Sequence, residues 1–201
     1  MFVQIMQGRL SSESDGELLQ QQMDEWIEQV RPGAIGFLGS TGGVTPDATV
    51  VVAARFESPE AARANSDRAE QSAWWQRASG LFGPDVTFHD CSTVDLMGDG
   101  GSDEAGFVQV MLGRTVDPQK LREVGQTLMP QIQQMRPEIL GGIVAWHDDD
   151  PSAYTQLVYF RSEEAARVGE QQMADDGSAS DFMALMDGPV TYLALPSPRL
   201  V

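Results

Sequence analysis

The stretch that decides the fold is FVQIMQGR at residues 2–9, because a closely similar stretch, FVQVMLGR, returns 105 residues later at residues 107–114. Three further matches follow in chain order. Arg31-Pro32 matches Arg136-Pro137 at the same offset. FESPEAAR at 56–63 then matches FRSEEAAR at 160–167, and VTF at 86–88 matches VTY at 190–192, both at an offset of 104 residues. Matches in order, with a net slip of one residue, indicate an internal duplication.

A short segment without apolar periodicity separates the two copies. Residues 98–105, GDGGSDEA, are small, acidic and flexible in composition, as expected of a linker. The sequence therefore predicts a first repeat at residues 1–97, a linker at 98–105 and a second repeat at 106–201.

Each repeat shows the same succession of hydrophobic patterns. In the first, residues 2–8 alternate as a strand does, and Asp15 to Val30 carry apolar residues at helical spacings of three and four. Two further strands, a second helix and a fourth strand are expected at 34–39, 49–56, 59–80 and 86–94. The second repeat gives helices at about 117–135 and 163–185 and strands at 107–114, 140–146, 154–160 and 190–195. The order β-α-β-β-α-β, twice, predicts an α+β protein made of two ferredoxin-like units.

One such unit leaves a face of its sheet without helices. Covering apolar surface is worth about 25 cal/mol per Å² removed from water. We therefore expect the two units to pack sheet to sheet within one chain, with the helices outside.

Composition limits the classes of partner. The chain has 201 residues and a formal net charge of −17, with Lys120 as its only lysine. This charge disfavours nucleic acid and anionic membrane surfaces, and no apolar run is long enough to span a bilayer. Cys91 is the single cysteine and no signal peptide is evident, so we expect a cytoplasmic protein.

The arrangement resembles the dimeric α+β barrel superfamily, especially antibiotic biosynthesis monooxygenase-like proteins, here as a tandem fusion. The resemblance is carried by Arg31-Pro32-Gly33 with Gly36, the strand Val50-Val51-Val52 ending at Phe56, then Ser58-Pro59-Glu60-Ala61-Ala62 and Trp74-Trp75. Members differ in chemistry, from cofactor-free oxygenation of polycyclic phenols to haem degradation and isomerisation, so the resemblance implies a fold and leaves the reaction open.

Three residues of the second helix are candidates for substrate binding. In the oxygenases of this family an aromatic and an asparagine orient the substrate, and Trp75 and Asn65 are the nearest counterparts here. Trp74 is next to Trp75, about 100° away around a helix, so one tryptophan could pack in the core while the other lines a cavity. The second repeat has Ser178 and Ala179 at these positions. Ordinary packing of both rings is the alternative.

Three strand residues complete the candidate site. His89 could act as a base, and Arg55 could bind an anionic oxygen. Gln4, matched by Gln109, is a polar residue among apolar neighbours and could contact substrate. The alternatives are a histidine facing solvent, an arginine paired with one of the many carboxylates, and glutamines hydrogen-bonded where the two sheets meet.

Metals and cofactors are not expected. The run His147-Asp148-Asp149-Asp150 has ligand-type side chains, but its place between two strands suits a solvated hairpin equally well. Haem needs an axial ligand, and the two expected second helices contain no histidine. No glycine-rich nucleotide fingerprint follows any strand.

Together these observations predict a small-molecule-binding protein whose pocket lies between the second helix and the sheet of the first repeat. The expected ligand is an apolar aromatic molecule. If the protein is an enzyme, we expect a cofactor-free monooxygenase of aromatic or polycyclic phenolic substrates, with His89 or Arg55 assisting deprotonation. The alternative is a non-catalytic ligand-binding or stress-associated protein of the same fold. A monomer, which would be a pseudo-dimer, and a homodimer both remain open.

Overall fold

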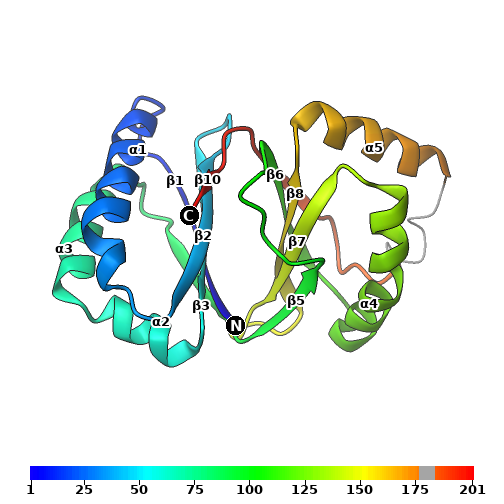
Figure 1. The fold of residues 1–201 in the computed structure, drawn as a ribbon, viewed down its shortest axis with the longest axis horizontal. Helices are drawn as coiled ribbons and strands as arrows, with labels where there is room; N and C mark the ends of the chain where they lie inside the picture. The colour runs from blue at the N-terminus through cyan, green and yellow to red at the C-terminus, as the bar shows by residue number, and fades with distance from the viewer. Residues whose placement is uncertain (177–183) are drawn as a thin grey trace. The chain divides into compact units, whose positions relative to one another are not determined.

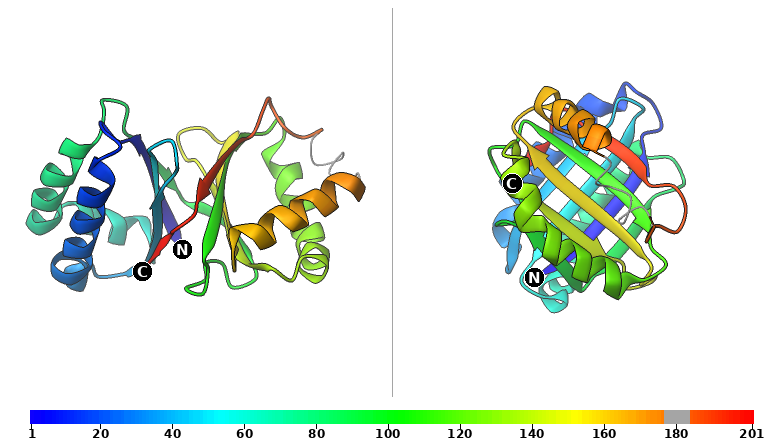
Figure 2. Two further views of the ribbon diagram at one scale, coloured as in Figure 1. Left: turned by 90° about the horizontal axis from the view of Figure 1, so that it is seen from above. Right: turned by 90° about the vertical axis from the view of Figure 1, so that its right-hand side faces the viewer.

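The computed structural model describes residues 1–176 and 184–201, and its contacts divide the chain into two compact units (Figure 1). Unit 1 comprises Met1–Ser92 with Arg199–Val201, and unit 2 comprises Thr93–Pro198. Each unit is a five-stranded antiparallel sheet that carries its helices on one face (Figure 2). The α+β class and the doubled β-α-β-β-α-β order are thereby confirmed.

The sheet of unit 1 has the strand order β10-β2-β3-β1-β4. Its strands are β1 (Phe2–Arg9), β2 (Phe37–Val44), β3 (Thr49–Phe56), β4 (Thr87–Cys91) and the short β10 (Arg199–Leu200). The first strand of the repeat, β1, lies between β3 and the last strand of the repeat, β4. This is the split arrangement expected of a ferredoxin-like unit.

The helices of unit 1 are α1 (Asp15–Glu25), which continues as a π-helical turn over Trp26–Val30, α2 (Pro59–Ser66) and α3 (Ala69–Ala78). The Ser58 side chain caps α2 by accepting the Ala61 amide at 3.2 Å. The single helix expected over 59–80 is interrupted after Ser66, where Arg68 is extended and turns its guanidinium inward to the Val30 carbonyl at 2.9 Å. This bond ties the break to the end of the first helix.

The helices of unit 1 cover one defined face of its sheet. Leu19 of α1 lies in one apolar cluster with Met6 of β1 and Val50 of β3, and Trp75 of α3 packs against it. Since side chains alternate along a strand, this helix-covered face also carries Phe2 and Gln4. Its second face carries the alternate residues of β1, which are Val3, Ile5, Gln7 and Arg9.

Unit 2 repeats the plan with the strand order β5-β7-β8-β6-β9. The strands are β5 (Thr93–Met97), β6 (Phe107–Arg114), β7 (Ile139–Trp146), β8 (Ala153–Phe160) and β9 (Thr191–Leu195), and the helices are α4 (Pro118–Met135) and α5 (Glu163–Asp176). Asp117 caps α4 by accepting the Lys120 amide at 2.9 Å, and Pro118 follows as the first helical residue.

The two sheets exchange strands at the seam. The strand expected over residues 86–94 is divided at Ser92: β4 pairs with β1, whereas β5 pairs with β7 of the second sheet. Near the other end of the chain, β10 pairs with β2. The compact units therefore divide at Ser92 rather than within residues 98–105. The bounds of the two sequence repeats, 1–97 and 106–201, stay a prediction.

Strand register also corrects the alignment of the repeats. Gly39 pairs with Arg55 as Gly141 pairs with Tyr159, so β2 and β7 are offset by 141 − 39 = 102 residues. The offset is 105 for β1 and β6 and 104 for β3 and β8. The net slip of one residue is thus a loss of three before the second strand and a gain of two in the hairpin after it.

Within residues 1–176 and 184–201, no helix combines the length and apolarity needed to cross a membrane. The sheet-to-sheet packing of the two units stays a prediction.

Candidate functional site

Trp75 is the candidate residue best placed to meet a ligand. Its ring is partly buried on the helix-covered face, with the Phe82 ring at 6.0 Å and the Phe88 ring at 5.4 Å between centroids, the latter in an edge-to-face arrangement. Phe88 lies on β4 at the edge of the sheet and is 50% exposed. The two rings therefore form an aromatic surface at this edge, which we call the Trp75–Phe88 surface.

Trp74 and Asn65 have structural roles instead. Trp74 is buried in a cluster with Trp26 and Val30, and its Nε1 donates to the Gln22 carbonyl at 2.7 Å. Asn65 is 6% exposed, and its Oδ1 accepts from Arg68 at 3.1 Å. Of the three helix candidates only Trp75 reaches a surface. The equivalent positions in the second repeat, Ser178 and Ala179, lie outside the described residues.

Gln4 lies beside the aromatic surface and is paired with a carboxylate. It is opposite Asp90 across the β1–β4 ladder, as Met6 is opposite Phe88, and its Nε2 donates to Asp90 Oδ1 at 3.0 Å. Paired residues of an antiparallel ladder project to the same face, so Gln4, Asp90 and Phe88 share the helix-covered face. Asp90 is exposed and can still accept a hydrogen bond from a bound molecule.

His89 and Arg55 do not join this group, which corrects the expectation of one pocket for all six residues. His89 is opposite Ile5 and Arg55 is opposite Val3, so both side chains project from the second face of the sheet. His89 is partly buried there. Arg55 Nε is buried and has no hydrogen-bond partner among the described residues. Any catalytic role for these two residues stays a prediction, and it cannot be exercised on a molecule held by Trp75.

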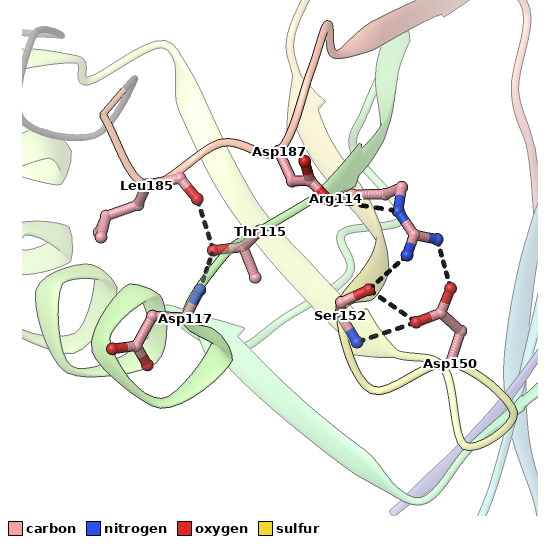
Figure 3. Close-up of polar contacts among 7 residues, drawn as sticks. All are labelled: Arg114, Thr115, Asp117, Asp150, Ser152, Leu185 and Asp187. Carbon is pink, nitrogen blue, oxygen red and sulfur yellow. Dashed lines mark hydrogen bonds and ion pairs between the residues drawn. The ribbon is translucent and has the colours of Figure 1, made fainter.

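The acidic hairpin of unit 2 is built around an arginine. Asp150 accepts from Arg114 and, at 2.7 Å, from the Ser152 hydroxyl (Figure 3). The hydrogen bond from Ser152 and then the bond from Arg114 hold the pKa of Asp150 below its ordinary value. His147 shares a hydrogen bond of 2.9 Å with the Thr155 hydroxyl through Nε2. Protein side chains thus already engage Asp150 and His147.

A polar cavity lies at one end of the second face in unit 1. It has a volume of about 290 Å³ and is lined by Gln7, Gly8, Arg9, Thr49, Asp85 and Thr87. None of these six residues belongs to the site predicted from the sequence. The strand register would have brought Gln7, Arg9, Thr49 and Thr87 together, because they occupy facing positions of neighbouring strands.

Phe88 and Asp90 were also missed as site residues. The sequence does indicate that Phe88 and Asp90 share one face of the sheet, because side chains alternate along a strand and His89 between them projects from the other face. What the alternation does not show is which of the two faces the helices cover.

Solved structures share the fold over almost the whole chain. A candidate monooxygenase from Fusobacterium nucleatum superposes with a TM-score of 0.78 at 7% identity, covering 99% of this chain and 93% of its own. A second, from Lactobacillus acidophilus, gives 0.74 at 11% identity, covering 100% of this chain and 98% of its own. An anthrone oxidase-like protein gives 0.71 at 11% identity, covering 99% and 92%. These likenesses show that the chain shares the fold of these three proteins.

Neither comparison by sequence adds to this. No family model matches the chain, and no curated protein matches it.

Proposed function

We propose that unit 1 binds a planar aromatic small molecule on the Trp75–Phe88 surface, with a hydroxyl or carbonyl of the ligand directed at Gln4 and Asp90. The observation that carries the proposal is the juxtaposition of a half-exposed phenylalanine, a partly buried tryptophan and a hydrogen-bonded amide–carboxylate pair on one face. Aromatic rings supply area for stacking, and the polar pair supplies orientation.

The reaction best suited to this arrangement is oxidation of an anthrone-type or phenolic substrate by molecular oxygen without a cofactor. Names of proteins with the same fold support it, since two are candidate monooxygenases and one is anthrone oxidase-like. The acidic C–H of an anthrone needs only a base and a surface that stabilises the delocalised anion.

Asp90 is the base in this proposal. It removes one proton from the methylene carbon, and the resulting carbanion gives its electron pair to O₂ to form a C–O bond and a peroxide anion. The peroxide anion takes the proton back from Asp90 to give the hydroperoxide. Loss of the second methylene hydrogen with cleavage of the O–O bond gives the ketone and one water. Overall, one anthrone and one O₂ give one anthraquinone and one H₂O, so no external reductant is needed.

A second candidate is binding without turnover. It is favoured by one observation: His89 and Arg55 project from the other face, so Asp90 is the only one of these groups that could move a proton beside Trp75. A ligand-binding or stress-associated role needs only the aromatic surface.

Anthrone binding and oxygen uptake test the proposal together. Trp75→Ala and Phe88→Ala should each weaken binding by about 3- to 10-fold, the range for one aromatic contact. Tyr192→Ala is the matched control, because Tyr192 occupies the position of Phe88 in unit 2 and is 58% exposed. Asp90→Asn should keep binding within about threefold and remove oxygen uptake.

The outcomes separate the two candidates. Saturable binding with no uptake above the buffer rate would leave only the non-catalytic role. The Trp75–Phe88 site itself would be rejected by an equal loss of binding in Tyr192→Ala and Phe88→Ala, or by the absence of saturable binding.

A further inference from the structure

Two equivalent arginines, one in each repeat, have different surroundings. In unit 2, Arg114 ends β6 and is held on three sides: it binds Asp150, donates to the Ser152 hydroxyl at 2.7 Å, and lies 3.8 Å from Asp187 (Figure 3). In unit 1, Arg9 ends β1 at the same position of the ladder. Arg9 is exposed, and within residues 1–176 and 184–201 its side chain makes no hydrogen bond or ion pair.

Backbone hydrogen bonds identify what replaces the three partners. Gly83 donates to the Arg9 carbonyl at 2.9 Å, as Asp187 does to the Arg114 carbonyl at 2.9 Å. Likewise, the Ala48 carbonyl accepts the same backbone hydrogen bond in unit 1 that the Ser152 carbonyl accepts in unit 2. The hairpin that holds Asp150 is two residues shorter in unit 1. Glycine and alanine have no side-chain acceptor to offer. The Asp47 carboxylate of the unit 1 hairpin lies close enough to interact with the charge of Arg9, but it forms no hydrogen bond or ion pair with it among the described residues.

The unpaired guanidinium lines the polar cavity of about 290 Å³ together with a carboxylate, Asp85. Asp85 is exposed and, like Arg9, has no hydrogen bond or ion pair of its side chain in the described part of the chain. Gln7, Gly8, Thr49 and Thr87 complete the lining. A second carboxylate nearby, Asp47, is already engaged by the hydroxyls of Thr45 and Thr49.

From this arrangement we infer a binding site for a small zwitterion of the amino-acid type, whose carboxylate meets Arg9 and whose ammonium group meets Asp85. Two opposite charges that line one cavity without pairing with each other are complementary to a ligand with the same two charges reversed. A purely anionic ligand would meet Asp85 and the field of a chain with net charge −17, whereas a neutral zwitterion avoids both penalties. The volume suits a small molecule rather than a drug-sized one.

The site lies on the second face of the sheet and is independent of the Trp75–Phe88 surface. Its existence therefore does not depend on the proposed function, and the two can fail separately.

The test is NMR titration of the full chain with β-alanine, 4-aminobutyrate and L-alanine, followed at the backbone amides of Gln7, Gly8 and Thr87. Acetate and ethylammonium, each with one of the two charges, are the reference ligands. At least one zwitterion should give saturable shifts and should bind more tightly than either reference ligand. Arg9→Gln and Asp85→Asn should each weaken it by about tenfold or more, the effect expected of losing a charged hydrogen bond.

A gain-of-partner variant provides a sharper test. Gly83→Asp rebuilds the contact that Asp187 makes with Arg114, and a Cβ at Gly83 would meet only the Arg9 carbonyl at 3.7 Å, so the change fits the backbone. Gly83→Asp should abolish zwitterion binding by occupying Arg9, whereas the uncharged Gly83→Asn should leave the affinity within about twofold.

Three results would overturn the inference: no saturable shift with any zwitterion, acetate binding as tightly as the zwitterions with no effect of Asp85→Asn, or equal affinities in Gly83→Asp and Gly83→Asn.

Discussion

Asp95 of β5 forms the polar connection between this exchanged strand and the rest of unit 2. Arg122 of α4 donates to both carboxylate oxygens, from Nε at 2.7 Å and from Nη2 at 2.8 Å. Trp146 of β7 donates its Nε1 to Asp95 Oδ2 at 2.8 Å. The Asp95 carboxylate thus adds side-chain hydrogen bonds from α4 and β7 to the β5–β7 ladder. Asp95→Ala removes the carboxylate and leaves the ladder.

The magnitude follows from the burial of the three groups. Trp146 is 5% exposed, so an indole N–H left without an acceptor costs about 1–3 kcal/mol. The ion pair with Arg122 is worth less, about 0.5–1 kcal/mol, because the Arg122 side chain is 38% exposed and the charges are screened. Asp95→Ala should therefore destabilise β5 by about 2–4 kcal/mol, and Arg122→Gln, which leaves the indole bond intact, by about 0.5–1 kcal/mol.

Hydrogen exchange is the appropriate assay because it reports the opening of individual strands. For Asp95→Ala the amides of Thr93–Met97 should exchange roughly 30- to 1000-fold faster than in the wild type, and for Arg122→Gln roughly 2- to 5-fold faster. The reasoning would be refuted if the two variants exchanged equally fast, since the indole bond would then contribute nothing. It would also be refuted by unchanged protection of β5 in Asp95→Ala.

The same carboxylate predicts a pH dependence. Partial burial acts to raise the pKa of Asp95, but the hydrogen bonds from Arg122, Trp146 and Gln126 outweigh it, so the folded-state pKa lies below 3.8. A lowered folded pKa gives stability that is present above the unfolded value and is lost as pH falls through the folded value. The difference in unfolding free energy between wild type and Asp95→Asn should be constant near neutral pH and should shrink below about pH 4.

Two further predictions concern backbone geometry and a buried phenol. Gly36→Ala should lower the free energy of unfolding by about 1–3 kcal/mol in urea denaturation. The reason is that Gly36 has φ +75° and a Cβ there would lie 2.8 Å from the Ala61 Cβ. Gly16→Ala is the control, because a Cβ at Gly16 in α1 would lie in open space and should not destabilise the protein. Burial raises the pKa of Tyr154 to about 12, so Tyr154→Phe should remove an ionisation step near pH 12 from the absorbance titration at alkaline pH; loss of a step near pH 10 would contradict this. Because the raised pKa favours the neutral phenol in the folded state, stability should decline as pH rises from about 10 toward 12.

The repeat determined how much of the fold was predictable. Alternation over residues 2–8 and helical spacing from Asp15 predicted the main elements of both units, because each pattern reflects burial on one face. The split of the fourth strand at Ser92 was not predictable, since β-type residues continue on both sides of it and only tertiary pairing assigns β5 to the other sheet. The break of the second helix coincides with a bond from Arg68 to Val30, which is 38 residues distant and leaves no local signal in the sequence.

The candidate site was predictable in part, for the same reason. The different burial of Trp74 and Trp75 was predictable, because adjacent helical residues point about 100° apart, and the structure buries Trp74 and leaves Trp75 partly exposed. A ligand contact of Trp75 stays a prediction. The burial of Asn65 and its bond to Arg68 could not be predicted, because Arg68 is three residues away and local hydrogen bonding of this kind leaves no periodic signal. His89 and Arg55 were correctly seen as strand residues, but which face the helices cover follows only from packing.

The asymmetry between the repeats is what assigns both proposed sites to unit 1. At the position of Asp90 unit 2 has Ala194, and there the matching glutamine, Gln109, is 6% exposed among apolar neighbours. At the position of Arg9 unit 2 has an arginine surrounded by acceptors. Unit 2 thus engages Arg114 in internal contacts and buries Gln109 without a facing carboxylate, so neither side chain is presented to a ligand as its counterpart in unit 1 is. Unit 1 places the corresponding groups at an accessible edge and in a cavity, where a bound molecule can provide the contacts that the chain does not.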